Sequence, residues 1–319
     1  MNQYLETNTK LWTGRISGQQ LYLHEKVQCI NLERDSIPNT SKKSFTLLGY
    51  ACDEGVNRNK GRKGAFKGPK AIRKALAKLP NHLEAETTLI DGGTLEFMDS
   101  KLENIQTHLS EKVMQLFEQN TFPILLGGGH DIAYGHYNGI KNHLGKNKTI
   151  GIINFDAHFD LRNNADGNNS GTPFFQIAED CKKDGSAFNY LCLGIRKDAN
   201  DKMLFQTAND LGVSYIENVN FSIQKAENIV RTLLDFIRHV DHIYVTIDLD
   251  GFSSAYAPGV SAPSPMGFSP DIVLETLQLI IESKKLISLD IAEMNPKYDI
   301  DSQTAKLAAS LIHFVMHAI

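Results

Sequence analysis

The chain has 319 residues, of which 41% are hydrophobic and 22% are charged, and its formal net charge is −4. This composition is ordinary for a globular protein with a large core, and it offers no excess positive charge for nucleic acid or an anionic membrane. The four cysteines are scattered without a C-x-x-C pair, which favours reduced thiols in a cytoplasmic protein. The N-terminus lacks the apolar core of a signal peptide, and no run approaches the roughly 18 apolar residues of a membrane-spanning helix.

Short apolar runs alternate with stretches of helical periodicity along most of the chain. The candidate strands are Phe45–Tyr50, Thr88–Asp91, Pro123–Leu126, Thr149–Phe155, Asn189–Leu193, Val213–Ile216, Ile243–Ile247 and Leu286–Ile291. The candidate helices are Pro69–Leu79, Lys101–Gln119, Asp131–Leu144, Ala199–Leu211, Ser222–His239, Pro270–Ser283 and Asp301–Ala318. Strands this apolar are usually covered on both faces, so we expect an α/β fold with a mainly parallel sheet of about eight strands between helix layers.

No long linker, internal repeat or low-complexity tract divides the sequence. We therefore expect a single domain over residues 1–319, with an N-terminal extension of about 40 residues packed on it. The segment Asp160–Gly171 is too polar and too rich in glycine and asparagine for a helix or strand. Such a composition predicts a long loop, and a loop of this length is typically functional.

Four of the predicted strands are followed by unusual clusters of polar residues. In open α/β sheets, ligands bind beyond the carboxyl ends of the strands. The i, i+2 spacing in DAHFD and DLD would send alternate side chains to one side of an extended backbone. The clustered residues are His130, Asp156, His158, Asp160, Asp248, Asp250 and Glu293.

The first six of these residues supply two imidazoles and four carboxylates. Four carboxylates in one cleft repel one another and raise each other's pKa unless cations compensate them. A ligand set rich in oxygen, with two histidines and no cysteine, suits Mn²⁺ or a similar metal. Because six ligands exceed the need of one tetrahedral zinc, we predict two metal ions that share a bridging carboxylate and ionise a water. A single aspartate or histidine at a strand end is more often a cap or turn residue, so the prediction depends on the cluster.

The segments GGGHD, NFDAHFD, DLDGFSSAYAPGVSAPSP and DIAEMNP closely resemble signature segments of the ureohydrolase (arginase/agmatinase) superfamily. The resemblance runs from about Phe45 to the C-terminus. It implies an arginase-like domain with a three-layer α/β/α fold, a binuclear manganese site with two Mn²⁺ per subunit, and assembly into homo-trimers or homo-hexamers.

The same resemblance implies a role for each clustered residue. In the family, a bridging hydroxide attacks a guanidinium or amidine carbon. By motif, Glu293 would bind the cationic C–N group, and Asp160 would also accept and relay a proton. One metal would bind His130, Asp156, Asp160 and Asp248, and the other Asp156, His158, Asp248 and Asp250, with Asp156 and Asp248 bridging.

Three features resemble the formimidoylglutamase branch, whose members convert N-formimidoyl-L-glutamate and water to L-glutamate and formamide in histidine degradation. The first is the pair of segments Leu11–Arg15 (LWTGR) and Asp53–Leu76. The second is Arg162, which stands where arginases carry an asparagine that contacts the substrate's amino-acid end, and a guanidinium there suits a carboxylate. The third is Ser170, which stands at the position of the arginase histidine that shuttles a proton.

Other residues are weaker candidates. Arg196 is a second candidate for binding a substrate carboxylate. Asn57, Arg58 or Arg62 would lie near the mouth of the site and attract a dianionic substrate, or would belong to a solvated loop and helix face. Seven other histidines do not stand in a metal-ligand spacing at the end of a predicted strand, and we expect them not to bind metal. They are His108, His136, His143, His239, His242, His313 and His317.

Alternative functions remain open at this point. Within the superfamily they are agmatinase, arginase or another guanidino-acid hydrolase that releases urea. A dinucleotide-binding protein would use the glycines of LLGGGHDIAYG, but Ile132 occupies the last glycine position of the G-x-G-x-x-G pattern. A third alternative is a catalytically silent metal-binding or assembly subunit. Such a subunit would not require all six ligands and Glu293, which this sequence retains.

Overall fold

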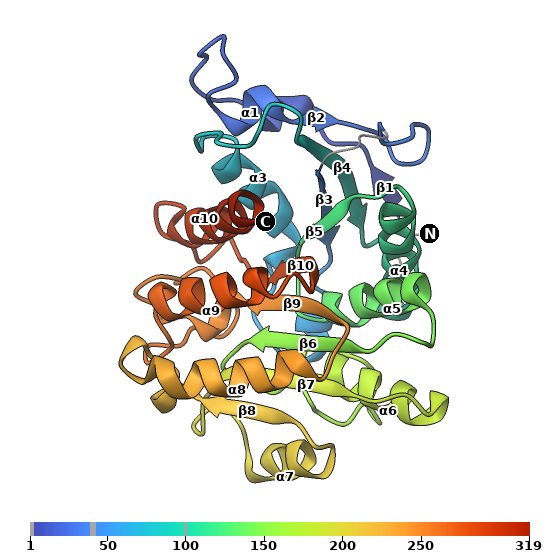
Figure 1. Ribbon diagram of the computed structural model, residues 1–319, viewed down its shortest axis with the longest axis vertical. Helices are drawn as coiled ribbons and strands as arrows, with labels where there is room; N and C mark the ends of the chain where they lie inside the picture. Colours follow the sequence, from blue (N-terminus) through green and yellow to red (C-terminus); the bar gives the residue numbers. More distant parts are fainter. Residues whose placement is uncertain (1–2, 39–42, 99–100) are drawn as a thin grey trace.

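The structure is a computed structural model that describes residues 3–38, 43–98 and 101–319, and its central element is a sheet. The strands are β1 (Gln3–Leu5), β2 (Gln28–Cys29), β3 (Ser44–Ala51), β4 (Thr88–Glu96), β5 (Phe122–Leu126), β6 (Ile150–Phe155), β7 (Asn189–Ile195), β8 (Ser214–Glu217), β9 (His242–Asp248) and β10 (Leu286–Ala292). Within the described ranges they form one sheet in the order β1-β4-β3-β5-β10-β9-β6-β7-β8, with β2 beside β4 (Figure 1). The pairing is parallel except between β1 and β4. The predicted mainly parallel sheet is confirmed.

Helices cover both faces of this sheet (Figure 1). They are α1 (Leu23–Lys26), α2 (Glu54–Arg58), α3 (Gly68–Leu76), α4 (Leu102–Glu118), α5 (Ile132–Leu144), α6 (Pro173–Asp184), α7 (Lys202–Asp210), α8 (Ala226–Arg238), α9 (Pro270–Glu282) and α10 (Gln303–Ala318). Helices α3, α8, α9 and α10 lie on one face, and α4, α5 and α6 lie on the other. The three-layer α/β/α prediction is therefore confirmed. No helix in the described part of the chain is long and apolar enough to cross a membrane.

The burial of the strands explains why their sequences are so apolar. Every residue of β3 and of β6 is buried, because helices pack on both faces of the sheet. Strand β4 continues five residues past its predicted end at Asp91, through Gly92 and Gly93. The glycines resemble a strand end in the sequence, but in the structure they lie opposite an irregularity in the β3–β4 register, where a bulge tolerates them.

The N-terminal segment contributes two edge strands that the sequence did not reveal, and it is tied to the sheet through Asp91. Trp12 Nε1 donates a hydrogen bond to Asp91 Oδ2 at 2.7 Å, and Thr7 Oγ1 donates to Asp91 Oδ1 at 2.8 Å. Arg73 on α3 pairs with the same carboxylate through two hydrogen bonds of 2.7 and 2.8 Å. Because this ion pair is fully buried, its carboxylate needs further hydrogen bonds, and Trp12 and Thr7 of the N-terminal segment supply two of them.

Candidate metal centre

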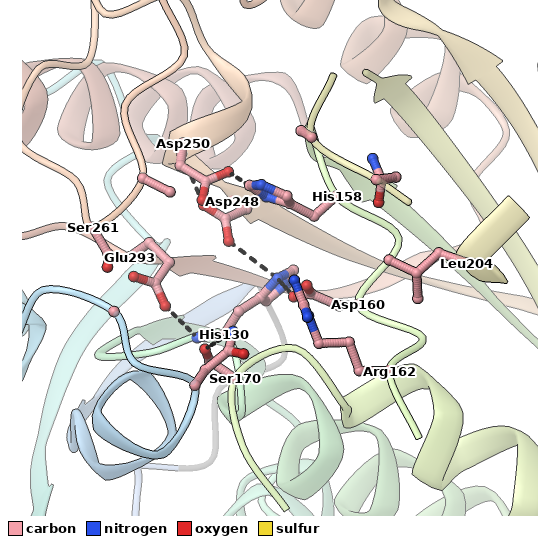
Figure 2. Close-up of a pocket in the computed structure, with 15 residues that line it drawn as sticks. His130, His158, Asp160, Arg162, Ser170, Leu204, Asp248, Asp250, Ser261 and Glu293 are labelled. Atoms are coloured by element: carbon pink, nitrogen blue, oxygen red, sulfur yellow. Dashed lines mark hydrogen bonds and ion pairs between the residues drawn. The ribbon is translucent and has the colours of Figure 1, made fainter. Parts of the chain in front are cut away.

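The strands that precede the predicted polar clusters are neighbours in the sheet, in the order β5-β10-β9-β6. Their carboxyl ends therefore meet at one edge, as the sequence predicted. Figure 2 shows the labelled side chains at this edge converging on one cavity. They are His130, His158, Asp160, Arg162, Ser170, Asp248, Asp250 and Glu293.

The first group of possible metal ligands surrounds His130. Its Nδ1 lies 3.2 Å from Asp156 Oδ2, 2.8 Å from Asp160 Oδ2 and 3.1 Å from Asp248 Oδ2. One ligand atom from each of these four residues lies within 4.8 Å of the others, so the group could hold a metal ion. Except for Asp160, which is partly exposed, the group is buried.

A second group of possible ligands lies beside the first and shares Asp156 with it. His158 Nδ1 lies 3.4 Å from Asp156 Oδ1 and 3.3 Å from Asp250 Oδ1. Asp248 belongs to the first group only, and its Oδ1 accepts a hydrogen bond of 2.8 Å from the backbone N–H of Asp250. The structure thus brings all six predicted ligands together as two adjoining groups with Asp156 in common.

The electrostatics of these groups show that they need positive charge. Burial lowers the pKa of His130 and of His158, but the surrounding aspartates raise it more, so both pKa values lie well above the usual 6.5. Burial, followed by the charge of Asp156, raises the pKa of Asp160 to about 6. Burial and the charge of Asp248 raise the pKa of Asp250 well above its usual value. An oxygen-rich ligand group with this unmet need for positive charge fits a divalent metal ion.

Glu293 is positioned by an unusual backbone conformation. Its φ is 65°, and that of Asp160 is 48°; non-glycine residues in this region store strain of about 1–3 kcal/mol and cluster at functional sites. Glu293 Oε1 accepts a hydrogen bond of 3.0 Å from the backbone N–H of His130. Its Oε2 is buried without a hydrogen-bond partner among the described residues. Burial, then the charges of Asp248 and Asp250, raise the pKa of Glu293 well above its usual value. The free Oε2 is suited to a cationic or hydrogen-donating ligand.

The clustered side chains line a cavity of about 230 Å³. Its other wall residues include Asn59, Gly61, Arg162, Ser170, Ala199, Asn200, Leu204, Ser261 and Ala262. Polar groups on several loops therefore face the candidate metal centre, and the volume suits a small molecule.

The predicted loop Asp160–Gly171 forms one wall of this cavity and contains no helix or strand. Its ends are joined by a hydrogen bond of 2.9 Å from Arg162 N to Gly171 O. A Cβ at position 171 would lie 2.8 Å from Arg162 Cδ, so glycine leaves room for that side chain. Ser170 is held by Asn59, whose Nδ2 donates to its Oγ at 3.2 Å.

The other predicted arginines have structural partners. Arg196 is not among the residues that line the cavity, and its guanidinium makes two hydrogen bonds of 3.0 and 2.5 Å to Asp198. Arg62 donates to Ser261 O and Val260 O at 2.8 and 2.7 Å and stacks on a tyrosine ring.

Arg58 pairs with glutamates on α2 and α4 and donates to the backbone of the long loop. The residues of this segment that line the cavity are Asn59 and Gly61, and Asn59 is the one with a polar side chain. Sequence reasoning missed it, because an asparagine in a turn-rich segment carries no spacing signal.

The glycine run before His130 has a packing role. A Cβ on Gly127 would lie 2.5 Å from Ile291 O, and one on Gly128 would lie 1.9 Å from Cys52 O. Because these glycines have no side chain, neighbouring backbone packs directly against them. The packed backbone leaves no space beside them for a dinucleotide phosphate. None of the seven histidines that the sequence set aside belongs to a possible ligand group in the described part of the chain.

Comparisons with known proteins agree with this architecture. The family model of the arginase family matches residues 43–318. A formimidoylglutamase from Clostridium tetani is 42% identical over 325 aligned positions, covering 99% of this chain and 96% of the relative.

Two solved structures share the fold. A Trypanosoma cruzi formiminoglutamase crystallised with Mn²⁺ has a TM-score of 0.76 at 25% identity, covering 86% of this chain and 93% of that one. A formimidoylglutamase from Bacillus subtilis has a TM-score of 0.81 at 22% identity, covering 95% of this chain and 94% of that one. The length of the sequence match and the shared architecture show that the chain belongs to the arginase family of hydrolases.

Proposed function

We propose that this chain hydrolyses the amidine C–N bond of N-formimidoyl-L-glutamate to give L-glutamate and formamide, as a cytoplasmic enzyme of histidine degradation. The observation that carries the proposal is the position of Arg162, a guanidinium on the wall of the cavity that the His/Asp groups line. The name of the Clostridium tetani relative supports the same substrate. An acidic substrate suits Arg162 because a guanidinium binds a carboxylate through paired, charge-assisted hydrogen bonds.

We infer that the two ligand groups hold two Mn²⁺ ions. The first ion would be held by the His130 group and the second by the His158 group, with Asp156 shared and Asp248 as a further bridging candidate. Bound metal ions would neutralise the carboxylates and lower the pKa of a coordinated water so that it is nucleophilic near neutral pH. The T. cruzi structure, whose Mn²⁺ is stated for that protein, supports the choice of metal.

Residues of the chain itself would bind and orient the substrate. Arg162 would bind a carboxylate at the glutamate end, and Ser170, held by Asn59, would offer a neutral hydrogen-bonding group beside it. Glu293 Oε2, which lacks a partner among the described residues, would accept a hydrogen bond from the cationic amidine N–H. We assign the carboxylate contact to Arg162 before Arg196, since the latter is paired with Asp198 and is absent from the cavity wall.

Asp160 is the residue we propose to transfer a proton. Its carboxylate lies in the cavity at 2.8 Å from His130 Nδ1, and its pKa is raised to about 6 by burial and by Asp156. Because this carboxylate lines the cavity, it could accept a proton there and return it to a leaving nitrogen, although a bound metal ion would lower its pKa below that of the metal-free site.

A substrate panel tests the proposal. Manganese-loaded protein is incubated with N-formimidoyl-L-glutamate, arginine, agmatine and a guanidino acid, and the formamide, glutamate and urea formed are measured. We expect turnover of N-formimidoyl-L-glutamate alone. Urea from a guanidino compound, with no glutamate from N-formimidoyl-L-glutamate, would instead assign the chain to the agmatinase, arginase or guanidino-acid hydrolase alternatives. Light scattering of the same sample tests the expected homo-trimer or homo-hexamer.

A further inference from the structure

A buried polar network lies directly behind the candidate metal centre, on the side of His130 away from the cavity. It joins two adjacent strands, because the β9–β10 register pairs Thr246 with Asp290 and Tyr244 with Ser288. Helix α5 adds His136 to it. All five of these residues have a relative exposure of 0%. Polar groups buried to this extent need complete hydrogen bonding, so each bond in the network has a defined direction.

The direction of these bonds reaches His130. Thr246 Oγ1 donates its single hydrogen to Asp290 Oδ1 at 2.5 Å. The same oxygen lies 3.0 Å from His130 Nε2, so it can only accept there, and Nε2 must carry a hydrogen. A neutral imidazole protonated at Nε2 presents a lone pair at Nδ1, which is the nitrogen that faces the aspartates of the first ligand group.

The far side of the network holds Asp290 in its accepting role. Its Oδ2 accepts a hydrogen bond from the Tyr244 hydroxyl and lies 2.6 Å from His136 Nδ1. His136 Nε2 lies 2.6 Å from Ser288 Oγ, which donates onward to the carbonyl oxygen of Pro123 at 2.9 Å. A carbonyl oxygen only accepts hydrogen bonds, so the Ser288 hydroxyl uses its one hydrogen there and must accept from His136 Nε2–H. The proton between His136 Nδ1 and Asp290 Oδ2 completes the hydrogen bonding of the network. Tyr244 and His136 thus occupy Oδ2, and Oδ1 remains for Thr246.

We propose that Thr246 and Asp290 are positioning residues that fix His130 in its metal-binding tautomer. The inference rests on the proposed metal centre and concerns its first ligand group. Among the described residues, the ion-pair partners of His158 are Asp156 and Asp250, which lie outside this network, so the second group should not depend on it. Loss of a hydrogen bond behind a ligating histidine typically weakens metal affinity about 10- to 100-fold.

Three substitutions separate a positioning role from a structural one. Thr246→Val keeps the shape of the side chain but removes the hydroxyl, Thr246→Ser restores it, and Asp290→Asn turns an acceptor into a possible donor to Thr246. The matched control is Thr276→Val on α9, which also removes a buried threonine hydroxyl, one that donates to a backbone carbonyl at 2.7 Å. The His158→Asn background removes a ligand of the second group, so that binding by the first group can be measured alone.

The test measures Mn²⁺ binding by titration calorimetry. We expect Thr246→Val and Asp290→Asn to weaken one of two Mn²⁺ sites about 10- to 100-fold, or to abolish the remaining site in the His158→Asn background. Thr246→Ser and Thr276→Val should bind Mn²⁺ as the wild type does. Wild-type affinity at both sites in Thr246→Val and Asp290→Asn would overturn the inference and leave the metal centre intact. Absence of Mn²⁺ binding in the wild type would overturn the proposed centre itself and this inference with it.

Discussion

Arg162 and Gly171 are joined by a hydrogen bond of 2.9 Å between backbone N–H and carbonyl, across the base of the long loop that follows β6. This bond brings Arg162 and Ser170 to the same wall of the cavity, beside a histidine and aspartate cluster. The loop therefore has two tasks. Asp160 at its start is a candidate metal ligand, and Arg162 and Ser170, near its two ends, are the groups proposed to select the substrate.

Replacing Arg162 should weaken substrate binding more than it slows the reaction. Loss of charge-assisted hydrogen bonds, worth about 1.5–3 kcal/mol each, predicts that Arg162→Met raises KM about 10- to 100-fold while kcat changes little. Arg162→Lys should recover only part of the loss, because an ammonium does not bind a carboxylate through a planar fork. Steady-state kinetics with N-formimidoyl-L-glutamate measure the effect. The control is Arg196→Met, which removes an arginine outside the cavity wall; a larger KM effect at Arg196 would transfer the carboxylate-binding role to it.

Replacing the shared ligand should abolish metal binding as a whole. Asp156 belongs to both ligand groups, so Asp156→Asn is expected to lose both ions, whereas Asp250→Asn should lose only the second. A ligand that binds only the folded protein raises its melting temperature, so Mn²⁺ should stabilise the wild type but not Asp156→Asn. Metal content and thermal unfolding measure this, with Asp166→Asn on the exposed part of the loop as the control. Equal metal content in wild type and Asp156→Asn would contradict the ligand assignment.

The N-terminal LWTGR segment should contribute stability and not substrate binding. Trp12→Phe removes the 2.7 Å hydrogen bond to the buried Asp91 carboxylate, and hydrogen bonds to charged groups contribute about 1.5–3 kcal/mol. We expect a loss of this size in the free energy of unfolding, with unchanged KM. Ile16→Ala, at a side chain that is 86% exposed, should change the free energy by less than about 0.5 kcal/mol. Urea unfolding and kinetics test both statements, and a raised KM in Trp12→Phe would contradict them.

Mild acid should destabilise the region where α10 meets the loop after α3. Burial lowers the pKa of His313 and of His317 below the usual 6.5, partly offset by their backbone hydrogen bonds. The unfolded chain then binds more protons than the folded one just below pH 6.5, so stability is full above that pH and falls as pH decreases through it. Protonation also prevents His317 Nε2 from accepting the 3.0 Å hydrogen bond from the His82 backbone.

Urea unfolding of metal-free protein at pH 5.5 and pH 8 measures this dependence. The double variant His313→Gln/His317→Gln should lose less stability than the wild type between these two pH values. The difference between wild type and variant cancels the titration of the cavity aspartates, which is common to both. An identical pH dependence in the two proteins would show that these histidines do not contribute.

The sequence predicted those parts of the molecule that depend on local pattern. β6 is buried along its whole length, and its apolar run is recognisable in the sequence. The six predicted metal ligands lie at or just after the ends of strands, and those ends must meet in a parallel sheet. Edge strands β1 and β2 contain three and two residues, too few to show a period. Asn59 and the Thr246–Asp290 pair became visible only in three dimensions, because their importance comes from a loop contact and from the register of two strands.

The most direct test of the account is the identity of the products from N-formimidoyl-L-glutamate, since either nitrogen of the amidine carbon can leave during hydrolysis. Manganese-loaded protein and a chelator-treated sample are compared, and glutamate, formamide, ammonia and N-formylglutamate are quantified together. We predict equal amounts of glutamate and formamide, formed only with the metal present. Ammonia and N-formylglutamate as the products, or full activity after exhaustive chelation, would contradict it.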